Sequence, residues 1–344
     1  MIHQSVASCI GQTPLVQLNR LFPYKGINVI AKLEFLNPGG SVKDRPARFI
    51  VEQGLQNGTI DQKTHLIEST SGNLGIALAM VAKVYNLQFT CVVDPKISAT
   101  NLQILHLLGA NIEMVHVRDD QGGYLKSRIQ RVQELLHDIP QSLWINQYAN
   151  DLNWQAHYYG TGSEMVASLD GSIDCLILPV STTGTMLGIS RRLRSEFPGL
   201  RVIAVDAVGS VIFGTPSGQR EIPGIGASRV PELSKQIEVD EVIYVNDWES
   251  AQGCRALVKY EGIFAGGSSG SVIAAIQKLL PSVPSPYRIL TLFPDRGERY
   301  LNMVYDDNWV GQLHHSDAQP NLSTFTTKLP TFNKAELKNL NLLT

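Results

Sequence analysis

The sequence has few cysteines and few charged residues, and both shortages restrict what the protein can be. Its 344 residues include four cysteines, with no Cys-x-x-Cys pair. Neither a disulfide scaffold nor a metal site is therefore expected, and a reducing compartment, the cytoplasm, is the expected location. Charged residues make up 17% of the chain, below the roughly 25% of average globular proteins, whereas hydrophobic residues make up 43%. This balance favours a well-packed chain over a disordered one.

Long apolar runs and an excess of charge of one sign are also absent. No apolar run reaches the about 18 residues of a membrane span, and residues 1–15 lack the basic-then-apolar order of a signal peptide. Lysine plus arginine total 29, against 31 for aspartate plus glutamate, which gives a net charge of −2. Nucleic acid and membranes are therefore not expected partners.

Short apolar, β-branched runs alternate with segments of helical spacing along most of the chain. This alternation predicts an α/β fold with two open parallel sheets, each in a three-layer αβα block, roughly before and after Asp151. Residues 312–344 are rich in Asn, Ser, Thr and Pro and are expected to form a loosely held tail. The expected strands are 65–68, 89–94, 111–117, 143–146, 174–180, 201–206, 241–245 and 288–293, and the expected helices are 73–86, 97–108, 123–138, 185–197, 248–260 and 271–280.

The first of four unusual loops, residues 37–46, approaches a helix start through two glycines. Pro46 must lie in the first turn of that helix, so Lys43 lies at or just before its start. The positive end of the helix dipole favours the neutral form of an amine there. Lys43 is therefore either a solvated lysine near a cap or an amine kept nucleophilic for Schiff-base chemistry.

Two further loops follow expected strands and open expected helices, where backbone N–H groups bind anions. Residues 69–75 carry three hydroxyl or amide side chains and two glycines, more than a simple helix cap needs, which favours an anion site. Residues 181–185, Ser-Thr-Thr-Gly-Thr, suit a dianionic phosphate. The chain has neither a GxxxxGK[ST] nor a GxGxxG pattern, so nucleotides are not indicated.

The fourth loop, Gly266–Gly270, matches the G-x-S-x-G pattern of a serine hydrolase. A hydrolase also needs a histidine further along the chain, and only His314 and His315, in the expected tail, follow the loop. A hydrolase is therefore disfavoured, and a tight turn before a helix is the simpler interpretation.

Taken in order, the four loops resemble those of the β-family, or fold type II, of pyridoxal-phosphate enzymes, which includes cysteine synthase and cystathionine β-synthase. Gly-Gln-Thr-Pro-Leu at 11–15 and Lys-Leu-Glu at 32–34 add to the resemblance, which runs from about Gly11 to Tyr305. It implies a tryptophan synthase β-like fold and a homodimer. Residues 1–41 with 151–311 would form the larger cofactor-binding domain, and 42–150 the smaller, mobile, substrate-binding domain.

The resemblance also implies residue roles. Lys43 would be the catalytic residue, joined to pyridoxal 5′-phosphate as an imine; Asn73 would bind the ring oxygen and Ser268 would face the ring nitrogen. A hydroxyl there, rather than a carboxylate, makes the ring a weaker electron sink and favours β-elimination and β-replacement. The cofactor phosphate would contact Ser181, Thr182, Thr183, Gly184 and Thr185, and the substrate carboxylate would contact Thr70, Ser71, Gly72 and Gln147.

Departures from cysteine synthases at Leu74, Ser181, Thr183 and Ser228-Arg229 make the chain look closer to the N-(2-amino-2-carboxyethyl)-L-glutamate synthases, which supply 2,3-diaminopropionate for siderophores. This implies that O-phospho-L-serine and L-glutamate react through an α-aminoacrylate. Arg128, Tyr148 and Ser181 would hold phosphoserine, and Arg229 would bind glutamate. Surface charges remain the alternative for both arginines, and cysteine synthase, cystathionine β-synthase or a non-catalytic cofactor-binding protein remain the alternative functions.

Overall fold

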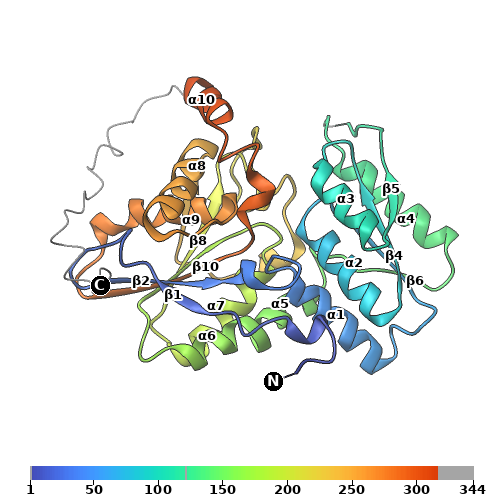
Figure 1. Cartoon of the computed structure of the whole chain (residues 1–344), viewed down its shortest axis with the longest axis horizontal. Helices are drawn as coiled ribbons and strands as arrows, with labels where there is room; N and C mark the ends of the chain where they lie inside the picture. The colour runs from blue at the N-terminus through green and yellow to red at the C-terminus, as the bar shows by residue number, and fades with distance from the viewer. Residues whose placement is uncertain (1, 121, 317–344) are drawn as a thin grey trace.

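The computed structural model describes residues 2–120 and 122–316, which form two sheet-containing units lying side by side (Figure 1). The larger sheet has the strand order β1-β2-β10-β7-β8-β9, and all its neighbouring strands are parallel except β1, which runs antiparallel to β2 at one edge. Its strands are β1 (Leu15–Gln17), β2 (Ile27–Leu33), β7 (Cys175–Pro179), β8 (Arg201–Ala207), β9 (Glu241–Val245) and β10 (Tyr287–Phe293).

The smaller sheet is parallel throughout, with the order β5-β4-β3-β6. The α/β prediction of two parallel-stranded sheets is confirmed, although β1 and β2 were not among the expected strands. The strands are β3 (His65–Ser69), β4 (Gln88–Val93), β5 (Asn111–Met114) and β6 (Ser142–Trp144).

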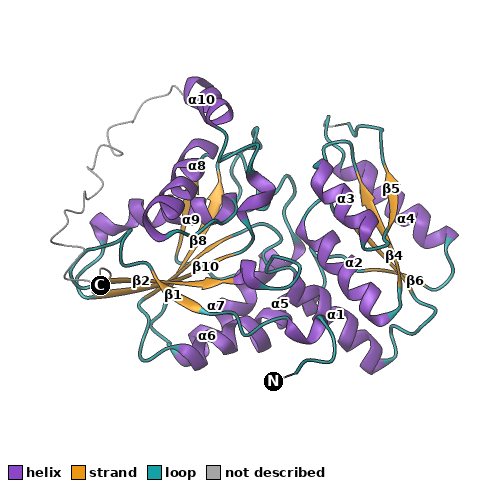
Figure 2. Ribbon diagram, viewed as in Figure 1, coloured by secondary structure: helices purple, strands orange, loops and turns teal. Residues whose placement is uncertain are grey.

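Helices cover both faces of each sheet (Figure 2). The long helices are α1 (Asp44–Asn57), α2 (Asn73–Tyr85), α3 (Ala99–Leu107), α4 (Leu125–Asp138), α7 (Gly184–Glu196), α8 (Asp247–Ala256), α9 (Gly267–Leu279) and α10 (Asp307–Ser316). The shorter ones are α5 (Asp151–Ala156), α6 (Ser163–Ser168), the 3-10 turns η1 (Ala7–Cys9), η2 (Glu34–Leu36), η4 (Glu232–Gln236), η6 (Leu280–Ser282) and η7 (Gly297–Tyr300), and the π-helical turns η3 (His157–Gly162) and η5 (Leu257–Glu261).

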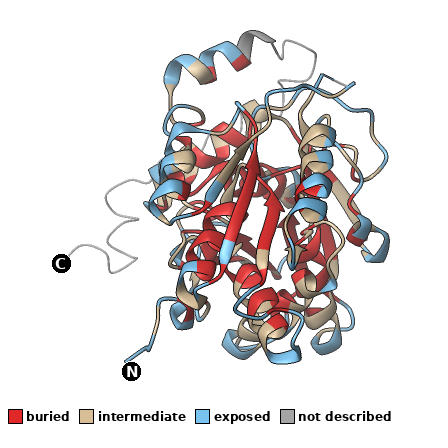
Figure 3. Ribbon diagram, turned by 90° about the vertical axis from the view of Figure 1, so that its right-hand side faces the viewer, coloured by how far each residue is buried: buried red, intermediate tan, exposed pale blue. Residues whose placement is uncertain are grey.

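The core consists of an apolar layer on each face of each sheet. Strand β7 is buried at every residue because its alternate side chains face opposite layers: Ile177 packs with α8 and α9, whereas Leu178 packs with α6 and α7. Figure 3 shows such buried strands enclosed by helices whose outer faces are exposed. No helix in the described part of the chain is long and apolar enough to cross a membrane.

Helix α9 begins at Gly267, four residues before the expected start at 271. Local turn preferences predict a turn at Gly266–Gly270, but the small residues there allow close helix packing instead. A Cβ added at Gly270 would lie 2.0 Å from the carbonyl oxygen of Ser250 on α8. The glycine therefore lets α8 and α9 approach closely, and Ser268 lies within the first turn of α9 rather than in a loop.

The expected tail, 312–344, begins inside helix α10, which runs to Ser316. The remainder, 317–344, lies outside the described residues. Of the first ten residues, Ala7 and Ile10 pack in the core beneath the smaller sheet, together with residues of α1 and α2.

Candidate active site

The four loops meet at one pocket at the carboxyl ends of β7 and β10. Both units contribute to its wall, and side chains from all four loops line it. The sequence-predicted cofactor residues on that wall are Lys43, Asn73, Ser181, Thr182, Thr183, Thr185 and Ser268, with Gly184 as the first residue of α7 beside them. They are joined there by Val42, Pro179, Met186, Gly224, Leu292, Pro294 and Asp295.

Lys43 is the N-cap residue of α1, as the position of Pro46 predicts, and its side chain is half-buried. Burial lowers the pKa of Lys43 to about 8, and the nearby Asp295 carboxylate opposes that shift only in part. An amine with this pKa is available in its neutral, nucleophilic form near physiological pH.

Asp295, which sequence reasoning missed, lies beside Lys43 in the pocket. Its Oδ2 accepts hydrogen bonds from Asn73 Nδ2 at 2.7 Å and from the Tyr300 hydroxyl at 2.6 Å, while its buried Oδ1 has no partner. Burial raises the pKa of Asp295. Arg299 donates to both Asn73 Oδ1 and the carbonyl of Gly39, so residues 295–300 tie the Asn73 and Lys43 loops together. Residues 295–300 could have been found from the sequence, because they come directly after a buried strand, where ligand-binding loops lie in such sheets.

The loop at residues 181–185 is shaped to hold an anion. Thr183 is the N-cap of α7 and has a φ of +70°, a left-handed conformation that is strained for a threonine. Its Oγ1 is buried and has no hydrogen-bond partner. A Cβ at Gly184 would lie 2.5 Å from the side chain of Asn153, so only glycine fits there. An orphaned hydroxyl at the start of a 13-residue helix matches the donor set that a phosphate requires.

A neutral histidine lies behind this loop. His157 Nε2 is 3.2 Å from Thr185 Oγ1, and its Nδ1 is 2.9 Å from Thr161 Oγ1. Burial, together with the positive charges of Lys43 and Arg45, holds the pKa of His157 well below its usual range. This ring therefore orients the Thr185 hydroxyl without adding a charge.

The second anion loop, Thr70 to Gly72, joins β3 to the start of α2. Arg128 donates from Nη1 to Ser71 Oγ at 2.9 Å and pairs with Asp94 at 3.2 Å, with its side chain 14% exposed. Arg128 is therefore part of this loop's surroundings and not a solvated charge on the outer face of its helix.

Gln147 follows β6 and lies beside the same loop. The buried Glu68 connects the two segments: its Oε1 accepts from Ser69 N at 2.7 Å and its Oε2 from Gln147 N at 3.2 Å. Burial raises the pKa of Glu68 to about 7, although these hydrogen bonds oppose the shift. Glu68 was not recognised from sequence, because it reads as an ordinary strand residue.

Tyr148 and Arg229 contact each other. The Arg229 guanidinium lies over the Tyr148 ring, 4.4 Å from its centroid, and pairs with Glu232 at 2.6 Å. The structure thus brings Arg229 next to the residue that follows Gln147.

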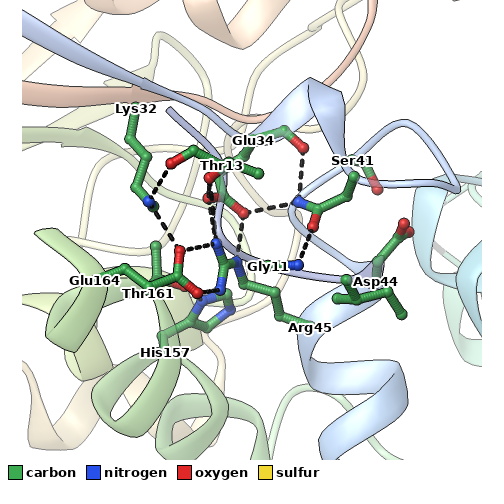
Figure 4. A network of polar contacts seen from close by, with 12 residues as sticks. Gly11, Thr13, Lys32, Glu34, Ser41, Asp44, Arg45, His157, Thr161 and Glu164 are labelled. Carbon is green, nitrogen blue, oxygen red and sulfur yellow. Dashed lines mark hydrogen bonds and ion pairs between the residues drawn. The ribbon is translucent and has the colours of Figure 1, made fainter. Parts of the chain in front are cut away.

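A buried ionic network supports the Lys43 loop from behind (Figure 4). Arg45 forms two-pronged ion pairs with Glu34 (2.6 and 2.8 Å) and Glu164 (both 2.7 Å). Lys32, fully buried, bonds Glu164 at 2.9 Å and the carbonyl of Thr13 at 2.7 Å. Burial opposes ionisation of Glu34, but the Arg45 charge and its hydrogen bonds hold the pKa of Glu34 below its usual value.

The residues present fit a phosphate-bearing aldehyde cofactor. The amine with a lowered pKa lines the same pocket as Thr183, whose hydroxyl has no partner, and Asn73 and Ser268 line it too.

Comparison with known proteins agrees with this fit. The family model described as "Pyridoxal-phosphate dependent enzyme" matches residues 6–295. A relative from Ralstonia nicotianae named N-(2-amino-2-carboxyethyl)-L-glutamate synthase is 59% identical over 318 residues, which cover 92% of this chain and 94% of that protein. A relative of the same name from Cupriavidus metallidurans is 58% identical over 330 residues, covering 95% and 97%.

Solved enzyme structures also resemble this chain over most of its length. An O-acetylserine-dependent cystathionine β-synthase from Helicobacter pylori is 34% identical, with a TM-score of 0.82 and coverage of 88% of this chain and 98% of its own. A hydrogen sulfide-producing enzyme from Fusobacterium nucleatum is 30% identical, with a TM-score of 0.81 and coverage of 87% and 100%. The chain therefore belongs to the family of pyridoxal-phosphate-dependent enzymes and has the fold type II architecture that its four loops predict.

Proposed function

We propose that this enzyme joins O-phospho-L-serine and L-glutamate to form N-(2-amino-2-carboxyethyl)-L-glutamate and phosphate. In this β-replacement the Cβ–O bond to phosphate breaks and a bond from Cβ to the glutamate nitrogen forms. The observation that carries the proposal is the 58–59% identity, over more than nine-tenths of each chain, to two proteins named for this product.

In this proposal the pocket residues hold the cofactor. Lys43 would bind it covalently, Asn73 and Ser268 would contact its ring, and Ser181 to Thr185 would surround its phosphate, with Thr183 Oγ1 and the N-terminus of α7 as donors. Pyridoxal phosphate supplies an electron sink that acidifies the Cα–H bond of an attached amino acid.

The protein's own side chains would then bind the substrates and transfer the Cα proton. Thr70, Ser71 and Gly72, with Gln147, would bind the substrate carboxylate. Lys43 Nζ would take the Cα proton and later return it. Arg128, with Tyr148 and Ser181, would bind the phosphate of phosphoserine and stabilise it as it leaves, since Arg128 already contacts Ser71.

We also propose that residues 42–150 close as a unit over the larger unit formed by residues 1–41 and 151–311, that the enzyme is a cytoplasmic homodimer, and that its product supplies 2,3-diaminopropionate for a siderophore. The two-sheet architecture supports the first point. The other points rest on the family resemblance, and size-exclusion chromatography with light scattering tests the dimer.

Mass spectrometry of products from paired substrates tests the reaction. Phosphoserine or O-acetylserine is combined in turn with glutamate, sulfide, ammonia and homocysteine. The proposal expects the glutamate adduct and phosphate to form fastest from phosphoserine with glutamate. Faster turnover of O-acetylserine with sulfide would make the enzyme a cysteine synthase, and a homocysteine adduct would make it a cystathionine synthase.

A further inference from the structure

The Arg229 guanidinium lies over the Tyr148 ring, 4.4 Å from its centroid, and the charges of Arg128 and Arg220 also act on the Tyr148 phenol. Burial raises the pKa of Tyr148, and the charges of Arg128, Arg229 and Arg220 each act to lower it. The three come from separate places: Arg128 from α4 in the smaller unit, and Arg220 and Arg229 from the segment between β8 and β9 in the larger unit. Arg220 had no place in the sequence analysis.

Each of these arginines has an unused donor. The Nε–H groups of Arg128, Arg220 and Arg229 are all buried and have no hydrogen-bond partner. No other arginine in residues 2–120 and 122–316 leaves a buried Nε–H unpaired. A buried charged donor without an acceptor is costly, so the three unpaired Nε–H groups indicate that anionic ligands complete them.

Arg220 differs from the other two because it lacks an ion pair. Arg128 pairs with Asp94 and Arg229 with Glu232, whereas Arg220 has no carboxylate within 4 Å among the described residues. Its Nη1 donates to the carbonyl of Ile225 at 3.2 Å and its Nη2 to Ser228 Oγ at 2.8 Å. These two bonds fix the guanidinium plane and leave the Nε–H without a partner, and the Asp206 and Asp247 carboxylates act on its charge without forming an ion pair within 4 Å.

The fixed guanidinium stands next to the reacting pocket. A Cβ at Gly226 would lie 2.8 Å from Arg220 Nη1, and the carbonyl of that same Gly226 accepts a hydrogen bond from Ser181 at 3.0 Å. Gly224, in the same segment, lines the pocket itself. Gly226 therefore connects Arg220 to Ser181, in the loop that is proposed to hold the cofactor phosphate.

We propose that Arg220 is a specificity residue that binds one carboxylate of the incoming dicarboxylic amino acid, with Arg229 binding the other. This inference rests on the proposed function and adds a residue to it. The charges match, since L-glutamate carries two carboxylates and the segment between β8 and β9 presents two guanidinium groups. Arg128, which contacts the Ser71 loop of the other unit, serves the first substrate.

A structural role for Arg220 makes a different prediction. The carboxylate of Asp206 is buried, its Oδ2 has no partner, and its charge acts on Arg220. If Arg220 only compensates Asp206, the double variant Arg220→Ala/Asp206→Asn should regain wild-type behaviour. If Arg220 binds substrate, the double variant should keep the defect of Arg220→Ala.

The test compares holoenzyme variants by steady-state kinetics. Arg220→Ala is expected to raise the KM for glutamate at least about tenfold, the loss expected for one charge-assisted hydrogen bond, and to change the KM for phosphoserine less than about twofold. Arg220→Lys, which keeps the charge but loses the Nε–H and its fixed plane, should have a KM for glutamate between those of wild type and Arg220→Ala. Arg194→Ala, which removes a surface cation paired with Asp240, is the matched control and should match wild type.

Calorimetric titration of the holoenzyme separates this inference from the proposed reaction. Glutarate, a dicarboxylate that cannot react, should bind the wild type more tightly than Arg220→Ala, and inorganic phosphate should bind both equally. A wild type that does not use glutamate would refute the proposed function, yet weaker glutarate binding in the variant would still support the carboxylate subsite. Weakened phosphate binding with unchanged glutarate binding, or rescue by Asp206→Asn, would overturn the role of Arg220.

Discussion

Two groups of charged residues, the Arg45 network and the charges of the site, are built in opposite ways. In the Arg45 network, Lys32 and Arg45 face Glu34 and Glu164, two cations against two carboxylates, and every nitrogen of the Arg45 guanidinium has an acceptor. In the pocket, the Asp295 carboxylate only partly offsets the burial of the Lys43 amine, and Arg128, Arg220 and Arg229 each keep a buried Nε–H unpaired.

The difference separates charges that hold the fold from charges that bind ligands. A compensated buried network costs little once formed, but removing one member leaves its partners unpaired. A charge that is only partly compensated gains its remaining partner only when substrate or cofactor arrives, so its removal should cost binding or turnover and leave the fold intact.

Lys43→Ala should abolish β-replacement, a loss of at least about a thousandfold, since no other amine lines the pocket among the described residues. The variant should also lose the visible absorbance band of lysine-bound pyridoxal phosphate while its melting temperature stays close to that of the apoprotein. Lys83→Ala, at an exposed position of α2, is the control and should keep both activity and band. An unchanged band in Lys43→Ala would show that Lys43 does not bind the cofactor covalently.

Arg45→Met, two residues further on, should destabilise the fold. It leaves Glu34 and Glu164 buried without their main partner, which costs about 3–5 kcal/mol of unfolding free energy. The same substitution at Arg48, on the same helix, breaks a half-exposed pair with Glu52 and should cost under about 1 kcal/mol. Urea denaturation measures both, and equal losses at the two positions would contradict the distinction between compensated network and surface pair.

The sequence predicted the residues that line the pocket better than it predicted the buried ion pairs and hydrogen bonds around them. Lys43 at a helix start followed from Pro46, and the loop at 181–185 followed from hydroxyls after an apolar strand, because both signals are local. The Arg45–Glu164 pair joins positions 119 residues apart, and the Asn73–Asp295 bond joins positions 222 apart, so no local pattern could reveal them. The early start of α9 was missed because packing against α8, not turn preference, decides the role of Gly270.

The pH dependence of cofactor uptake tests whether the Lys43 amine is buried and only partly compensated. Because burial lowers its pKa to about 8, the apoprotein amine is protonated below that pH and neutral above it. The rate of pyridoxal phosphate uptake, followed by absorbance, should therefore rise about tenfold per pH unit up to pH 8 and level off above. Asp295→Asn should move the midpoint lower, because the Asp295 charge raises the pKa of Lys43. A rate still climbing near the ordinary lysine pKa of about 10.4 would show a solvated amine.

Arg229→Ala should give the smallest effect, because Arg229 is only partly uncompensated. Its side chain is 27% exposed and pairs with Glu232, while its Nε–H remains unpaired. Loss of a partly screened contact should raise the KM for glutamate about three- to tenfold and leave phosphate release from phosphoserine alone, without glutamate, unchanged. Glu232→Gln is the counterpart: freeing Arg229 from its ion pair should lower that KM or leave it unchanged. Equal losses in phosphate release and in glutamate use would place Arg229 with the first substrate, and the carboxylate side of the site would then rest on Arg220 alone.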